Sequence, residues 1–183
     1  TLKEFREARD SAKQGKGARG FQSGASQAGA RARPVPLREV DSARARRLPV
    51  EPAEIARVLG GGLVEGSVVL LGGEPGVGKS TLLTRLALDW VRKGLRVLYV
   101  AGEESPAQIR LRAERLGFRP DEEEGFAILQ EVALEPLVEA LDGALAGGDG
   151  PAVIIADSVQ TLHSEHVDAY PGSPTQIRTC GGV

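Results

Sequence analysis

The chain has 183 residues, of which 41% are hydrophobic and 26% charged, a balance typical of a globular domain with one core. Its longest apolar runs fall far short of the roughly 20 residues that cross a bilayer, and no secretory signal opens it, so we expect a cytoplasmic protein without a membrane partner. Since Cys180 is the only cysteine, an internal disulfide and a cysteine-rich zinc site are excluded.

Positive charge is concentrated at the beginning of the chain. Residues 1–50 carry 12 Lys and Arg against 5 Asp and Glu, whereas the rest carries 11 against 20. The stretch 11–36 is rich in Gly, Ala, Ser and Gln and has too little apolar area to offset the entropy of ordering. We therefore expect a flexible basic arm over residues 1–47 and a folded core over residues 48–183. The arm either contacts nucleic acid through phosphates or serves as a solvated tether.

From residue 48 onward, apolar runs and turn residues alternate regularly. Continuous apolar runs predict buried strands, and apolar residues at helical spacing predict helices. Strands are expected over residues 67–72, 96–101, 126–129 and 152–156. Helices are expected over residues 53–59, 79–93, 106–117 and 134–145, the third beginning with a capping box at Ser105. This alternation predicts an α/β fold with a mainly parallel sheet and helices on both faces.

A glycine-rich segment joins the first of these strands to the helix at residue 79. It matches the phosphate-loop pattern GxxxxGK[ST] with Gly73, Glu74, Pro75, Gly76, Val77, Gly78, Lys79 and Ser80. Glycines let the backbone curl until its N–H groups point inward, and the start of a helix favours anions. We expect this segment and Thr81 to bind ATP, with Lys79 on the β- and γ-phosphates and Ser80 on Mg²⁺. A merely structural turn would not require Lys and Ser directly after its last glycine.

Three carboxylates follow two other predicted strands. Asp157 ends an apolar strand at the sheet edge where ligands collect, so we expect it to hold Mg²⁺ directly or through water. Glu103 and Glu104 follow the strand at 96–101, where a carboxylate can orient and deprotonate an attacking water. We favour Glu103 as the catalytic residue. Glu104 is either catalytic as well or stabilises the N-terminus of the next helix.

Six segments resemble the bacterial RadA/Sms family of DNA repair proteins in order and spacing. They are residues 59–67, 73–83, 99–105, 112–117, 157–161 and 171–178. The resemblance covers about residues 48–178 and implies a RecA-like P-loop NTPase core. It also implies ATP hydrolysis coupled to single-stranded DNA binding and to branch migration in recombinational repair. Relatives of this kind form homo-oligomeric rings.

The resemblance further implies roles for individual residues. Lys79 and Ser80 would bind phosphate and Mg²⁺, Glu103 would activate water, and Asp157 would be the second Mg²⁺ ligand. Residues 163–175 fall where RecA-like proteins place a DNA-facing loop, and the candidate DNA contacts there and just beyond are His163, Ser173, Gln176 and Arg178. The family's zinc finger, its Lys-Asn-Arg-Phe-Gly motif and its C-terminal domain do not occur in the sequence, so we expect a fragment, truncated at the C-terminal side of the ATPase core.

Other functions stay open at this point. The chain could be a RecA-like ATPase that acts on a protein partner, or a nucleotide-binding module with little turnover. A small-molecule kinase also uses a phosphate loop, but no arginine-rich lid is visible in the sequence. Stimulation of ATP hydrolysis by single-stranded DNA would separate a DNA motor from an ATPase directed at protein.

Overall fold

The computed structural model describes residues 34–39, 46–120, 124–148 and 150–182. The chain divides into two units, residues 1–40 and 41–183. In the first unit, the described residues include one short 3-10 turn, η2 (Leu37–Glu39). Most of the basic arm expected over residues 1–47 lies outside the described residues. The other described helices and strands belong to the second unit.

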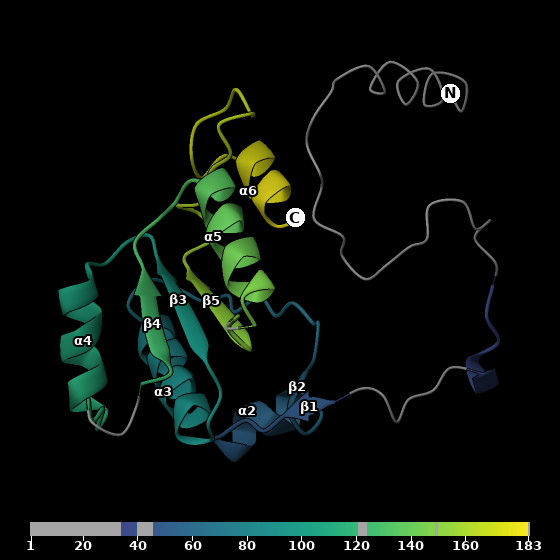
Figure 1. The fold of residues 1–183 in the computed structure, drawn as a ribbon, viewed down its shortest axis with the longest axis vertical. Helices are drawn as coiled ribbons and strands as arrows, with labels where there is room; N and C mark the ends of the chain where they lie inside the picture. The colour runs from purple at the N-terminus through teal and green to yellow at the C-terminus, as the bar shows by residue number, and fades with distance from the viewer. Residues whose placement is uncertain (1–33, 40–45, 121–123, 149, 183) are drawn as a thin grey trace. The chain divides into compact units, whose positions relative to one another are not determined.

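A three-stranded parallel sheet forms the centre of the second unit (Figure 1). β3 (Val97–Ala101) lies between β4 (Phe126–Leu129) and β5 (Val153–Asp157), and all three are strands that the apolar runs in the sequence predict. Its register sets Ala101 opposite Asp157. Because parallel strands end at the same edge of a sheet, the segment after β3 and the end of β5 come together there.

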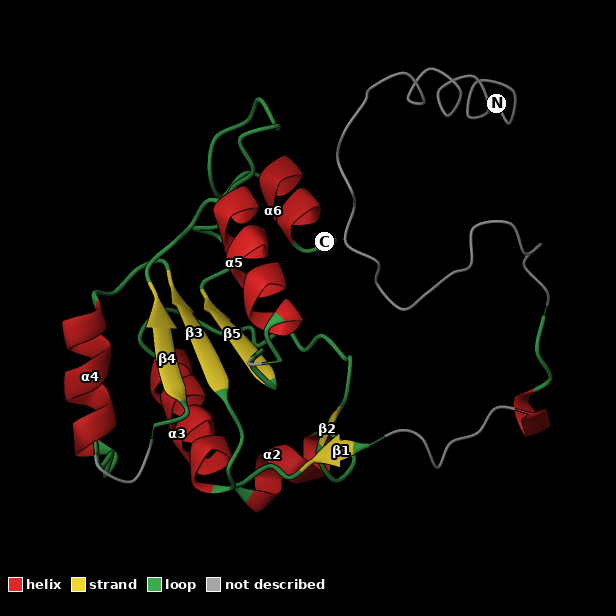
Figure 2. Cartoon of the chain, viewed as in Figure 1, coloured by secondary structure: helices red, strands yellow, loops and turns green. Residues whose placement is uncertain are grey.

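Helices cover both faces of this sheet, as predicted and as Figure 2 shows. On one face lie α3 (Lys79–Arg92) and α4 (Pro106–Arg115). On the other lie α5 (Leu134–Ala146) and α6 (Pro174–Cys180). The side chains of β3 alternate between two apolar cores, so that Tyr99 packs on the α3 side and its neighbour Val100 on the α5 side. No described helix is long and apolar enough to span a membrane.

A small antiparallel pair precedes the sheet. β1 (Arg47–Leu48) pairs with β2 (Leu63–Val64), and α2 (Ala53–Val58) lies between them in sequence, close to the helix expected there. This segment is tied to α3 because Trp90 Nε1 donates a hydrogen bond to the Pro49 carbonyl at 2.8 Å. The start of the core is thereby fixed to the helix that follows the phosphate loop.

The strand expected over residues 67–72 is not formed, which corrects the sequence prediction. The segment has no strand assignment, and Val68 and Leu70 are 93% and 82% exposed. None of the described strands pairs with it, since β3 has β4 and β5 as its neighbours. An apolar run becomes a buried strand only where a neighbouring strand satisfies its backbone N–H and C=O groups. The apolar composition of residues 67–72 does not determine whether another strand lies beside them.

Candidate active site

The backbone of the phosphate loop turns where glycine turns most easily. Gly76 and Gly78 have φ angles of 77° and 99°, in the left-handed region. At Gly73 space is limiting, because a Cβ atom would lie 3.2 Å from Val77 Cγ1 and 3.6 Å from Lys79 Cδ. The glycines of the pattern therefore serve two physical needs, positive φ and close approach. The curl that the sequence predicts for this loop is present.

α3 begins directly after the loop, at Lys79, and its N-cap residue Gly78 offers no side chain to its first N–H groups. Such N–H groups, at the positive end of the helix dipole, favour an anion. Lys79 Nζ donates hydrogen bonds to the carbonyls of Gly73 and Glu74, both at 2.8 Å, so the ammonium lies against the loop. A curled backbone, a helix N-terminus and a cation together fit a chain of phosphates.

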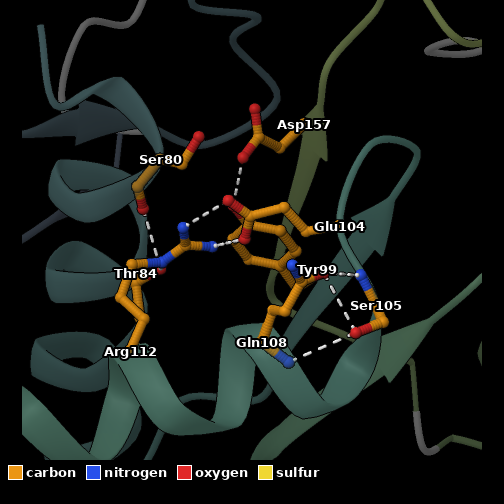
Figure 3. A network of polar contacts seen from close by, with 8 residues as sticks. All are labelled: Ser80, Thr84, Tyr99, Glu104, Ser105, Gln108, Arg112 and Asp157. Atoms are coloured by element: carbon orange, nitrogen blue, oxygen red, sulfur yellow. Dashed lines mark hydrogen bonds and ion pairs between the residues drawn. The ribbon is translucent and has the colours of Figure 1, made fainter. Parts of the chain in front are cut away.

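Asp157 ends β5 and is held by Tyr99 from the middle of β3. The Tyr99 hydroxyl donates to Asp157 Oδ2 at 2.5 Å (Figure 3). Burial, helped by the hydrogen bond to Asp157, raises the pKa of Tyr99 above its ordinary value, so the phenol keeps its proton and stays a donor. One oxygen of Asp157 is therefore fixed by the protein. A carboxylate held in this way is a suitable ligand for Mg²⁺.

The two acids after β3 have different partners. Glu103 is exposed, and its Oε1 accepts a hydrogen bond from Ser158 Oγ at 2.6 Å. Glu104 Oε1 accepts one from Arg112 Nη1 at 2.8 Å, and its Oε2 lies 2.5 Å from Arg112 Nη2. An ion pair thus neutralises Glu104, whereas Glu103 contacts the residue that directly follows Asp157. The structure thus gives different partners to Glu103, which the sequence favours as the catalytic acid, and to Glu104, whose role the sequence left open.

Arg112 and Thr84 belong to this network, although the sequence analysis gave neither a role in the site. Arg112 Nε donates to Thr84 Oγ1 at 3.0 Å, and the Thr84 hydroxyl donates to the Ser80 carbonyl at 2.7 Å. Burial opposes the charge on Arg112, but the hydrogen bond and the charge of Glu104 raise the pKa of the guanidinium. In the sequence, the feature that could have pointed to Arg112 is its position on α4, next to the residues of the buried helix face.

The turn that follows β5 leaves no room for a side chain at Gly102. A Cβ atom there would overlap the Thr161 hydroxyl. The Gly102 N–H donates to the Asp157 carbonyl at 2.9 Å, and the Thr161 hydroxyl donates to the Ser158 carbonyl at 2.7 Å. Gly102 therefore lets the two acids follow β3 directly beside the end of β5.

Comparison with known proteins agrees with this geometry. Residues 32–173 match the protein family described as an AAA domain. The chain belongs to this family. It is also a homologue of the DNA repair protein RadA, which confirms the resemblance and the P-loop α/β fold predicted from the sequence.

Three RadA relatives illustrate how far the similarity extends. The chain is 45% identical to DNA repair protein RadA of Mycobacterium tuberculosis over 144 residues, which are 79% of the chain and 29% of that protein. It is 40% identical to the RadA of Halalkalibacterium halodurans over 149 residues, 81% of the chain and 31% of the relative. It is 44% identical to the RadA of Campylobacter jejuni over 144 residues, which are 79% of the chain and 30% of that relative. The chain thus spans 29–31% of the length of these curated relatives.

The loop expected to face DNA in this AAA domain is built around one buried side chain. Gln176 is 1% exposed. Its amide oxygen accepts a hydrogen bond from the Ser164 N–H at 2.9 Å, and its amide nitrogen donates to the carbonyls of Ser164, Val167 and Ala169 at 3.0–3.1 Å. The Ser173 hydroxyl caps α6 by accepting from the Gln176 N–H at 3.3 Å. Gln176 and Ser173 therefore hold the loop in its shape.

The other two candidates for DNA contact differ in exposure. His163 is half-buried, and its backbone bonds to Val132 and Leu134 across the start of α5. Arg178 is exposed in the last turn of α6. Of the four residues, Arg178 is the one whose side chain reaches solvent most freely.

Proposed function

We propose that this AAA domain binds ATP together with Mg²⁺ and hydrolyses the γ-phosphate. One observation carries the proposal: a chain of polar contacts runs from the first turn of α3, directly after the phosphate loop, to the acids after β3. It passes from the Ser80 carbonyl through Thr84 and Arg112 to Glu104 (Figure 3). These contacts link the turn after the phosphate loop to the segment that carries Glu103, the acid proposed to activate water, and so support the proposal.

The chemistry assigns a role to each part of the site. The loop N–H groups and Lys79 hold the β- and γ-phosphates, and Ser80 and Asp157 hold Mg²⁺, which neutralises charge on the transferring phosphoryl group. Glu103 accepts the proton of the water whose oxygen attacks the γ-phosphorus, while the bond from that phosphorus to the ADP oxygen breaks. Glu103 serves this role better than Glu104, because Arg112 already engages the Glu104 carboxylate.

We further propose that hydrolysis serves DNA repair, through binding of single-stranded DNA and branch migration by a homo-oligomeric ring. The support is the homology to proteins named DNA repair protein RadA. A loop held in one shape by Gln176, with Arg178 exposed beside it, offers a defined surface and a cation for phosphate contact. Stimulation of ATP hydrolysis by single-stranded DNA, and not by double-stranded DNA or protein, would support this part of the proposal.

The binding step is tested with Lys79→Ala. Titration with a fluorescent ATP analogue and Mg²⁺ should show a loss of affinity of about tenfold or more, because a charge-assisted phosphate contact is lost while the backbone cradle remains. Lys93→Ala is the matched control, since Lys93 lies at the far end of α3 in an exposed ion pair with Glu51. Equal affinity in Lys79→Ala and wild type would refute the nucleotide site.

The hydrolysis step is tested with Glu103→Gln. The amide can hydrogen-bond water but cannot accept its proton, so turnover should fall by about a hundredfold or more while binding of the ATP analogue is retained. Glu104→Gln should lower turnover less. If the two variants act in the opposite order, the assignment of the catalytic acid is wrong.

A further inference from the structure

Between α4 and the segment after β3 lies a charged contact that takes no direct part in the proposed hydrolysis. Two guanidinium nitrogens of Arg112 meet the two carboxylate oxygens of Glu104, at 2.8 and 2.5 Å (Figure 3). Arg112 Nη2 and Glu104 Oε2 are buried atoms that have no hydrogen-bond partner apart from this ion pair. Removing one side chain therefore leaves a buried charged atom on the other uncompensated.

The third nitrogen of Arg112 links the same ion pair to the phosphate-loop helix. Its Nε donates to Thr84 Oγ1 at 3.0 Å, and Thr84 is fully buried in α3. The Thr84 hydroxyl in turn donates to the carbonyl of Ser80, one turn earlier in α3, at 2.7 Å. The planar guanidinium, with donors in fixed directions, can satisfy both partners at once.

Glu104 and Asp157 share neighbours in the site. The charges of Glu104 and Asp157 both act on the hydroxyl of Tyr99, and the charge of Asp157 also acts on Arg112. Glu103 contacts Ser158, the neighbour of Asp157. Through Arg112 and Thr84, Glu104 is linked to the Ser80 carbonyl, in the helix turn that directly follows the phosphate loop. An unpaired carboxylate close to bound phosphates repels them.

We propose that Arg112 is a positioning residue of the nucleotide site, which neutralises Glu104 and fastens it to the first turn of α3. The inference rests on the proposed ATP binding and deepens it. With Glu104 neutralised, the site carries one negative charge less beside the phosphates, and Glu103 remains the carboxylate that can accept a proton. With Glu104 tied to the Ser80 turn, the acid-bearing segment and the phosphate-binding turn keep a fixed relation.

The test compares three variants by titration of a fluorescent ATP analogue with Mg²⁺: Arg112→Gln, Glu104→Gln and the double variant. Arg112→Gln should weaken binding by about tenfold, the size expected when a charged hydrogen-bonding group is left unpaired. Glu104→Gln should weaken it by less than about threefold, and the double variant should return to within about threefold of wild type, since neither charge is then left alone. If the double variant binds as weakly as Arg112→Gln, the proposal is wrong.

A purely structural role for Arg112 gives a different pattern. It would lower the melting temperature of Arg112→Gln, and Glu104→Gln would not restore nucleotide affinity. Arg112→Lys serves where Arg112→Gln does not fold, since it keeps the charge but offers one nitrogen. Because this variant keeps the charge beside Glu104 but loses the link to Thr84, its affinity should lie between that of wild type and the loss of about tenfold expected for Arg112→Gln, and an affinity as low as the latter would overturn the proposal. Lys79→Ala distinguishes failure of the proposed nucleotide site from failure of the proposed role of Arg112. If Lys79→Ala binds the ATP analogue as well as wild type, the nucleotide site itself is refuted. If it loses binding and the Arg112 and Glu104 variants do not follow the pattern, only the role of Arg112 is refuted.

Discussion

Tyr99→Phe removes one hydroxyl from the centre of the molecule and leaves the rest of the side chain in place. Tyr99 is 1% exposed, and its ring lies 6.1 Å from that of Phe126, so the phenylalanine ring can keep the same packing. What is lost is the hydrogen bond to the carboxylate of Asp157. A hydrogen bond to a charged group contributes about 1.5–3 kcal/mol to stability. Because Asp157 is only half-buried and water can replace the phenol, we expect the lower end, about 1.5 kcal/mol.

This loss should be visible in thermal unfolding of the chain. For a unit of this size, about 1.5 kcal/mol corresponds to a fall in melting temperature of roughly 5 °C. Tyr170→Phe is the matched control, since Tyr170 is 89% exposed and the same change should alter stability by less than about 0.5 kcal/mol. If nucleotide binding is confirmed, Tyr99→Phe should also weaken the Mg²⁺-dependent part of the affinity, because Asp157 is then less firmly held. Equal melting temperatures of Tyr99→Phe and Tyr170→Phe would refute the reasoning.

Two further predictions concern the frame around the site. Gly102→Ala should destabilise the chain by about 1–3 kcal/mol, because the added Cβ atom would overlap the Thr161 hydroxyl. Gly143→Ala is the control, since it adds a Cβ atom in open space on α5 and should stabilise the chain slightly. Chemical denaturation of both variants measures the difference. Glu135→Gln should lower stability near neutral pH by a small amount, because the carboxylate is about a third exposed. Its hydrogen bond from Ser164 lowers the pKa of Glu135 below 4.5, so the advantage of wild type is present above that pH and disappears as the pH falls through the lowered value; melting temperatures from pH 3 to 7 test this.

The elements that the sequence predicts well are those determined by local chemistry. The capping box at Ser105 and Gln108 is present with both of its hydrogen bonds, and α4 begins at Pro106 as expected. β4 has the predicted bounds, and β3 and β5 agree to within one residue at each end. The glycine positions of the phosphate loop follow from the same kind of reasoning, since positive φ and lack of space are properties of a few neighbouring residues.

The strand at residues 67–72 shows where local reasoning ends. Its composition is as favourable as that of β5, yet β5 pairs with β3 while residues 67–72 pair with none of the described strands. Ile154, on β5, is itself 49% exposed. Burial of a strand depends on a partner that its own residues do not encode. Gln176 shows a similar limit: the resemblance offers it as a candidate DNA contact, and only the structure shows that its amide bonds to three loop carbonyls and one N–H group.

The partners of the two adjacent acids, Glu103 and Glu104, depend on the three-dimensional arrangement and not on the local sequence. Glu103 and Glu104 are adjacent and chemically identical; the sequence favours Glu103 as the catalytic acid but does not show which partner either carboxylate contacts. The chain bends over residues 102–104, directly after β3, and one carboxylate contacts Ser158 while the other contacts Arg112. Arg112 lies beside the buried Ile109 and Ala113 on α4, where helical periodicity places it at the edge of the apolar face without indicating its partner. The packing of α4 against α3 provides that partner, because it brings the guanidinium between Thr84 and Glu104. The different contacts of these two neighbouring glutamates are therefore a consequence of helix packing.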